Sequence, residues 1–146
     1  MGDSVHASAV QVGSLAVLIR GPSGSGKSQL AFNLVLAGRS GVIAPTFLIS
    51  DDRVRLGRSG DGIEVAAVES IAGRIEIRGL GIRRCAHVGA GKLGLVVDLA
   101  APDGARMPSA AALKVRILGV TVPRIPVMTD FPALSLVIAA LTTEEA

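Results

Sequence analysis

Short apolar runs separated by turn residues dominate the first half of the chain and predict strands around one helix. Residues 6–12 alternate in the way of a half-buried strand, and 15–19 form a continuous apolar run typical of a buried strand. From 27 to 37 apolar residues recur at helical spacing on most sides, so we expect a well-covered helix with Gly38 as its C-cap. Residues 46–50 have the pattern of the next strand, which ends at two carboxylates.

The second half of the chain consists mainly of expected strands. Their ranges are 53–56 and 63–67, which form a hairpin, followed by 94–99, 113–118 and 120–122. Residues 89–93 are interpreted as a glycine turn, and Pro132 precedes a last amphipathic helix over 134–141. One early helix followed mostly by strands predicts an α/β domain with a mixed sheet, not a regular βαβ repeat.

Composition changes this picture mainly by excluding classes of protein. The chain has 146 residues, 49% of them apolar and 18% charged, which predicts a single folded domain over 1–146. The aromatic residues are Phe32, Phe47 and Phe131 only, too few to stack a run of nucleic-acid bases. Twelve arginines and three lysines give a net charge of only +3 and are scattered, which also argues against nucleic-acid binding.

The cysteine content and the hydropathy indicate where the protein works. A single cysteine, Cys85, can form neither an internal disulfide nor a cysteine-based zinc site. No uncharged apolar run reaches the roughly 18 residues of a membrane-spanning helix. We therefore expect a cytoplasmic protein that has no membrane partner.

The strongest chemical signal is a glycine-rich loop at 21–28. It matches the pattern G-x-x-x-x-G-K-S/T at every fixed position, directly between a buried strand and a helix. Its backbone N–H groups and the start of the following helix can bind phosphate oxygens. Its lysine can bind the β and γ phosphates, and the hydroxyl of its last serine can bind Mg²⁺. A flexible turn is the alternative, but it would not need Lys-Ser at this spacing. The predicted nucleotide-binding residues are Gly21, Pro22, Ser23, Gly24, Ser25, Gly26, Lys27 and Ser28.

Other ionisable residues are candidates for chemistry beside this loop. Asp51 and Asp52 end the strand that follows the loop helix, where an acid can meet Mg²⁺ or accept a hydroxyl proton, and adjacent strand residues face opposite ways. An exposed Asp-Asp turn is the alternative. His6 alone would more often be structural, and Glu76 with Arg78, expected on one strand face, could be a surface ion pair.

At this point the sequence resembles the catalytic domain of HPr kinase/phosphorylase, which phosphorylates a serine of the phosphocarrier protein HPr. The segment 6–9 looks like the family's His-Ala-Ser motif, 21–28 like its nucleotide loop, and 50–52 like its Ala-Asp-Asp. Residues 76–82 reproduce the signature Glu-Ile-Arg-Gly-Leu-Gly-Ile. The resemblance implies a P-loop kinase domain of the HPr kinase and phosphoenolpyruvate carboxykinase-like kind, acting with ATP and Mg²⁺ on HPr or an HPr-like carrier.

The resemblance also implies roles for individual residues. Asp52 would be the base that takes the serine proton, supported by His6, while Lys27 holds phosphates. Ser28 and Glu76 would ligate Mg²⁺. Three further residues complete the predicted catalytic set, namely Asp51, Arg78 and Arg106, the last resembling the family's later catalytic arginine. A homohexamer is expected from the resemblance alone.

The sequence also departs from the family's pattern. We expect no regulatory N-terminal domain of the kind found in many members, as in short kinase-domain-only forms. Residues 38–47 are longer than usual, which leaves open which aspartate is the base. The family's Pro-Gly-Arg-Asn segment, implicated in phosphorylase activity, is not evident at 128–132, so kinase activity is the firmer expectation. A small-molecule kinase and a nucleotide-binding regulator with a decayed catalytic loop remain as alternatives.

Overall fold

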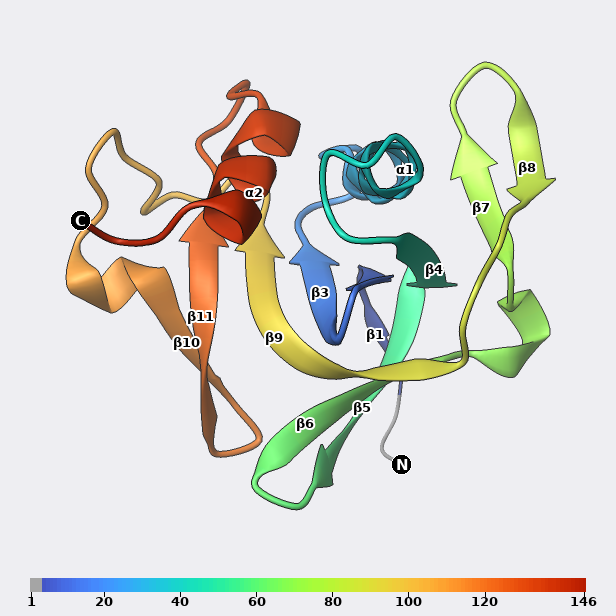
Figure 1. Cartoon of the computed structure of the whole chain (residues 1–146), viewed down its shortest axis with the longest axis horizontal. Coiled ribbons are helices and arrows are strands. Elements are labelled where there is room, and N and C mark those ends of the chain that lie inside the picture. Colours follow the sequence, from blue (N-terminus) through green and yellow to red (C-terminus); the bar gives the residue numbers. More distant parts are fainter. Residues whose placement is uncertain (1–3) are drawn as a thin grey trace.

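A curled mixed sheet with both α-helices on one side forms the framework of the molecule (Figure 1). The computed structural model describes residues 4–146. The strands are β1 (Ser4–His6), β2 (Ser8–Val12), β3 (Leu15–Arg20), β4 (Thr46–Ser50), β5 (Arg53–Ser59), β6 (Gly62–Ala67), β7 (Arg74–Ile77), β8 (Gly81–Arg84), β9 (Ala90–Asp98), β10 (Lys114–Ile117) and β11 (Val120–Pro126). The helices are α1 (Lys27–Arg39) and α2 (Ala133–Thr142), with short 3₁₀ turns at Glu69–Ile71 and Ala110–Leu113.

The main sheet combines parallel and antiparallel pairing, as the order of elements predicts. Its central path is β1-β5-β6-β9-β3-β2-β4, and β11 joins β9 and β10 at the side. β9 runs parallel to both β3 and β11, whereas β2 is antiparallel to β3 and β4. The expected mixed sheet is therefore confirmed, and three parallel strands end side by side.

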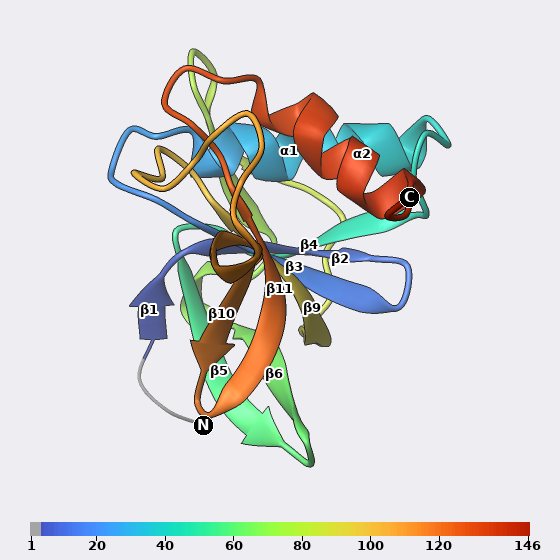
Figure 2. The same cartoon turned by 90° about the vertical axis from the view of Figure 1, so that its left-hand side faces the viewer.

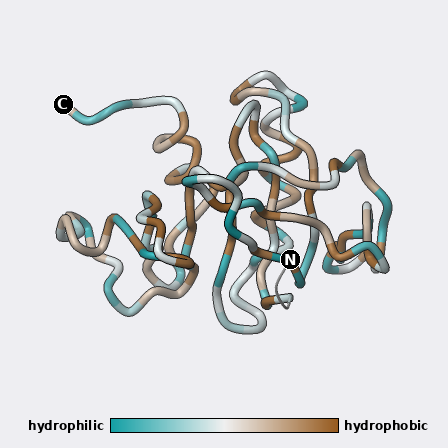
Figure 3. Tube along the Cα trace, turned by 90° about the horizontal axis from the view of Figure 1, so that it is seen from below, coloured by the Kyte–Doolittle hydropathy of each residue, from teal (hydrophilic) through white to brown (hydrophobic). Residues whose placement is uncertain are grey.

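Apolar side chains fill both faces of the sheet. On one face, α1 and α2 lie next to each other and cover a core that includes Val17, Leu34, Leu48 and Val97 (Figure 2). On the other, the β5–β6 hairpin encloses a second core around Leu18 and the buried strands beside it. Hydrophobic stretches accordingly gather in the interior of the trace, and the tail after α2 is hydrophilic (Figure 3). Over residues 4–146, neither α-helix is long and apolar enough to cross a membrane.

Several expected boundaries are wrong for identifiable reasons. The single strand expected over 6–12 is two strands, because the chain breaks at Ala7, whose N–H donates to the Asp52 carbonyl, and each half pairs with different neighbours. Gly38 is not a cap but lies inside α1, where a Cβ would come within 2.6 Å of the Thr46 nitrogen. Helix α1 is also less covered than expected, since Leu36 is exposed.

The expected glycine turn at 89–93 is also wrong, because Ala90 already begins β9. Gly91 and Gly94 lie within this strand where other chain segments approach closely. A Cβ on Gly91 would overlap the Gln11 side chain, and one on Gly94 would meet Leu15 at 2.9 Å. These glycines therefore reflect close packing against side chains of β2 and β3. The other predicted strands occur where expected, although β11 is longer than predicted, whereas the β7–β8 hairpin was not among the predicted strands.

Candidate active site

The glycine-rich loop connects the end of β3 to the start of α1, as its sequence predicts. Gly24 and Gly26 have φ angles of 80° and 100°, in the left-handed region that side chains disfavour. Gly26 is the N-cap of α1, and no side chain caps the first turn. The N–H groups that begin the helix are therefore left for a ligand, and the helix dipole favours an anion there.

Polar side chains of the loop fit a phosphate ligand. Lys27 Nζ donates to the carbonyls of Gly21 and Pro22 at 3.0 and 3.2 Å, so its ammonium lies across the loop. Ser25 Oγ is buried and, within residues 4–146, has no hydrogen-bond partner. An unpartnered buried hydroxyl is costly, and a phosphate oxygen at the loop would satisfy it. The donor set of the loop is thus that of a nucleotide phosphate site.

Asp51 links the loop helix to the neighbouring strands. Its Oδ1 accepts hydrogen bonds from Ser28 Oγ at 2.7 Å and from Ser8 Oγ at 2.8 Å. Its Oδ2 accepts from the backbone N–H of Glu76 at 3.0 Å. The side chain is 6% exposed, and all three donors are uncharged. Asp51 therefore carries its charge directly behind the hydroxyl that the sequence assigns to Mg²⁺.

Asp52 faces solvent at the opening of the site. Both carboxylates follow β4, which ends at Ser50, and Asp52 has a φ of 69°. Its carboxylate is 69% exposed and lies 4.0 Å from the His6 Nδ1, and Arg53 Nη1 is 3.0 Å from the other ring nitrogen. The two aspartates therefore point in different directions, as expected, although the left-handed backbone, not strand alternation, separates them. They also differ in burial, which the sequence did not predict.

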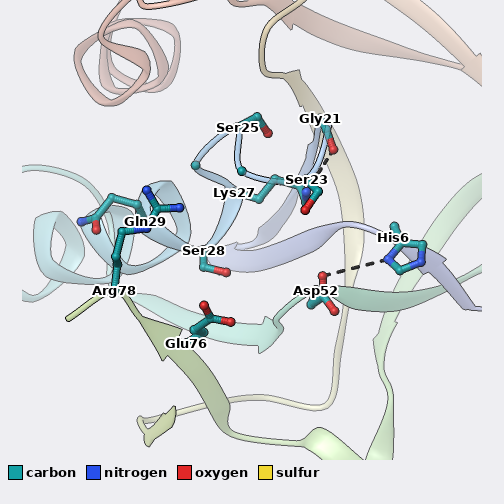
Figure 4. Close-up of a pocket in the computed structure, with 12 residues that line it drawn as sticks. His6, Gly21, Ser23, Ser25, Lys27, Ser28, Gln29, Asp52, Glu76 and Arg78 are labelled. Atoms are coloured by element: carbon teal, nitrogen blue, oxygen red, sulfur yellow. Dashed lines mark hydrogen bonds and ion pairs between the residues drawn. The ribbon is translucent and has the colours of Figure 1, made fainter. Parts of the chain in front are cut away.

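Glu76 and Arg78 reach the same site from the β7–β8 hairpin. Arg78 lies in the turn after β7, so the two residues do not share a strand face as expected. Both nevertheless line one cleft of about 920 Å³ with the loop (Figure 4). We call this the carboxylate cleft. Its lining is His6, Gly21, Ser23, Gly24, Ser25, Gly26, Lys27, Ser28, Gln29, Asp52, Glu76 and Arg78.

Two predicted catalytic residues do not line this cleft, since Asp51 is buried behind Ser28 and Arg106 lies elsewhere. Arg106 is exposed and lines a separate apolar groove of about 350 Å³, formed with Leu113, Ile125 and residues of α2. Its predicted catalytic role came only from the family resemblance, not from a pattern of residues around it. The structure thus brings His6, Lys27, Asp52, Glu76 and Arg78 to one cleft, and leaves Arg106 outside it.

Two features beside the loop are missing from the sequence-based prediction. Ser8 is fully buried, and its Oγ both donates to Asp51 and accepts the Asp52 N–H at 3.1 Å. Ser8 lies in the His-Ala-Ser motif noted at 6–9, but no role was predicted for it, because a serine in an alternating strand is otherwise unremarkable. Asp98, at the end of β9, binds Arg20 at 2.7 Å and Arg124 at 2.5 Å, and Arg124 in turn binds Asp103 at 2.7 Å.

The arginines control the ionisation of these two acids. Burial would raise the pKa of Asp98, but the hydrogen bonds and charges of Arg20 and Arg124 outweigh it and lower that pKa. Hydrogen bonds from Arg124 also lower the pKa of Asp103. Asp98 is therefore an anion that two cations already neutralise, directly next to the strand that feeds the loop.

Comparisons with known proteins agree with this geometry. The family model described as HPr Serine kinase C-terminal domain matches residues 2–140. An HPr kinase/phosphorylase of Exiguobacterium sibiricum is 34% identical over 134 residues, which cover 86% of this chain and 41% of that protein. An HPr kinase/phosphorylase of a Geobacillus species is 38% identical over 104 residues, which cover 66% of this chain and 31% of that protein. The chain thus spans less than half the length of these curated relatives.

A solved structure shows the same fold. The Hpr(Ser) kinase/phosphatase from Coxiella burnetii superimposes with a TM-score of 0.73 at 26% sequence identity. The match covers 96% of this chain and 93% of that one. The chain therefore has the same overall fold as this Hpr(Ser) kinase/phosphatase structure.

Proposed function

Because the chain belongs to the HPr serine kinase C-terminal domain family, we propose that it transfers a phosphoryl group from ATP to a serine of HPr or an HPr-like carrier. The observation that carries the proposal is the convergence of the loop lysine with Asp52 and Glu76 in one open cleft. Phosphoryl transfer requires positioned cations and a base more than covalent assistance. The carboxylate cleft offers the lysine and the carboxylates, and it is open to a protein substrate.

The residues beside the loop fit a nucleotide with Mg²⁺. Loop N–H groups, the Ser25 hydroxyl and Lys27 would hold phosphate oxygens, and Ser28 with Glu76 would hold the metal ion. Asp51 keeps the Ser28 hydroxyl oriented through their 2.7 Å hydrogen bond and places a negative charge one step behind it. When bound, Mg²⁺ neutralises charge on the transferred group.

Asp52 is the residue that would accept the serine proton. It is exposed at the cleft, whereas Asp51 is buried and its carboxylate is engaged by three donors. The His6 Nδ1 lies 4.0 Å away, near enough to orient this carboxylate. We therefore assign Asp52, not Asp51, as the base. The proposal does not use Arg106, which lies outside the cleft.

The cellular setting follows from the same proposal. An HPr kinase acts in the cytoplasm, where its carrier protein is found, and we expect the homohexamer that the family resemblance implies. Sedimentation analysis of the purified chain tests the assembly.

The test is incubation of the domain with labelled ATP, Mg²⁺ and purified HPr-like proteins, followed by identification of the labelled residue. Phosphoserine on the carrier supports the proposal. Lys27→Ala and Asp52→Ala are expected to abolish transfer, whereas Lys114→Ala and Asp61→Ala, exposed residues away from the cleft, are matched controls. Phosphohistidine, or label on a small metabolite with no label on any carrier, would overturn it.

A further inference from the structure

Three parallel strands end beside the phosphate loop and form a second cleft there. β3, β9 and β11 run in the same direction, and the residues that follow them are Gly21, Leu99 and Val127. In α/β sheets, ligands bind in the crevice outside the carboxyl ends of such strands. We call the cleft of about 620 Å³ at this edge the strand-end cleft. The loop residues 23–26 line it together with the carboxylate cleft, so the loop forms a wall of both.

The walls of the two clefts differ in chemistry. The carboxylate cleft contains the ionisable side chains His6, Asp52, Glu76 and Arg78. Away from the loop, the strand-end cleft has mainly apolar walls, with a few polar groups from Asn33, Thr129 and Asp130. Its apolar lining is Leu30, Leu99, Val127, Met128, Phe131, Pro132 and Leu134. An apolar cleft with a few polar groups is the usual environment of a bound heterocycle.

The one aromatic side chain of this cleft lies on a fixed support. Phe131 is 43% exposed, and its N–H closes a turn onto the Met128 carbonyl at 3.1 Å. The Val127 N–H donates to the Asp98 backbone carbonyl, and the Val127 carbonyl accepts from the Ala101 N–H, both at 2.8 Å, which ties the start of this turn to the end of β9. Helix α2 begins two residues after the ring. A half-exposed ring on a tethered turn is suited to stacking on a flat ligand.

Resting on the proposed function, we propose that the strand-end cleft binds the nucleoside of the phosphate donor and that Phe131 stacks on its base. The phosphates would then cross the loop, with the transferred group in the carboxylate cleft and the base on the opposite side. The turn that carries Phe131, 128–132, is the segment where this sequence lacks the family's Pro-Gly-Arg-Asn pattern. The proposed stacking contact therefore depends on Phe131 of this chain and not on the family's Pro-Gly-Arg-Asn pattern.

The test compares equilibrium binding of Mg-ATP and of inorganic tripolyphosphate, which has the phosphates but no nucleoside. Phe131→Ala is expected to weaken ATP binding about tenfold, because a stacking contact is lost, and to leave tripolyphosphate binding unchanged. Phe131→Leu keeps apolar volume against α2 and is expected to show a smaller loss. Phe47→Ala, a comparably exposed phenylalanine on β4 away from the cleft, is the matched control.

The two ligands separate the possible failures. Equal ATP affinity in wild type and Phe131→Ala would overturn this inference while the proposed function stands. Parallel loss of ATP and tripolyphosphate in Phe131→Leu, with its melting temperature unchanged, would also overturn it, because the substitution would then act on the loop. Wild-type protein that binds neither ligand would overturn the proposed function, and the nucleoside site with it.

Discussion

Asp51 and Asp98 lie at the ends of two strands on either side of β3, and their partners differ in charge. Asp51 accepts hydrogen bonds from two serine hydroxyls and one backbone N–H. Asp98 is bound by two arginines, one of which also binds Asp103. Both carboxylates are largely removed from water, so each needs its donors.

We expect this difference to separate an acid that acts in the proposed reaction from one that supports the fold. Uncharged donors satisfy the Asp51 oxygens but leave its negative charge uncompensated, so it can favour a cation at Ser28. The negative charge of Asp98 is already compensated by Arg20 and Arg124, so it would attract a metal ion only weakly. Asp98 instead joins Arg20 on β3 to Arg124 on β11, which holds the ends of the three parallel strands together.

Replacing each aspartate by asparagine removes its charge without changing the size of the side chain, and so tests whether the two acids have different roles. Asp51→Asn is expected to lower kcat/KM for phosphate transfer about 1,000-fold, roughly 4 kcal/mol, because the metal-binding hydroxyl loses the anion behind it. The amide oxygen can still accept from the two hydroxyls, but the amide NH2 then faces the Glu76 N–H, so we also expect a modest fall in the melting temperature. Steady-state kinetics over a range of Mg²⁺ concentrations measures the effect. Wild-type turnover at low Mg²⁺ would show that the Asp51 charge is not used.

Asp98→Asn is expected to act on stability. Removing the anion leaves Arg20 without its carboxylate and Arg124 with Asp103 as its only carboxylate partner, at a site where the Arg124 side chain is only 12% exposed. We therefore expect a loss of about 2–3 kcal/mol in the free energy of unfolding at pH 7. Urea denaturation of both proteins measures it.

The loss should depend on pH in a defined direction. Because the folded protein lowers the pKa of Asp98, its contribution is full above the unfolded value near 3.8 and disappears as pH falls through the lower folded value. The wild type and Asp98→Asn should therefore converge in stability at acid pH. A difference that stays constant down to the acid unfolding transition would contradict this account.

The smallest expected effect concerns Ser8, the buried hydroxyl that touches both Asp51 and Asp52. Ser8→Ala leaves the Asp52 N–H without its acceptor, and we expect kcat to fall about tenfold with the KM for ATP nearly unchanged. Ser50→Ala is the matched control, because Ser50 is equally buried but its hydroxyl meets the Val68 N–H at 3.5 Å. Equal losses in both variants would make Ser8 merely structural. A changed pH profile of kcat in Ser8→Ala alone would support its positioning role.

Much of the fold could be predicted because its signals are local. β4, β3 and the helix after the loop follow from apolar runs and helical spacing within single segments. The glycines of β9 misled the prediction, since a glycine in a turn and one packed against a neighbouring strand look the same in sequence. Likewise Gly38 is required by Thr46, a contact that no local pattern records.

The sequence by itself determined the phosphate loop, because eight consecutive residues contain its glycines, its lysine and its serine, and their backbone geometry is local. The tertiary structure was needed to show that Asp51 bonds to that serine, that Asp98 is bound by arginines, and that Phe131 lies beside the loop. These contacts depend on strand pairing between distant parts of the chain. Ser8 and Asp51 are 43 residues apart in the sequence, and Arg20 and Asp98 are 78 residues apart. The physical reason is that pairing and burial, not residue type, determine whether a carboxylate meets a hydroxyl or a guanidinium.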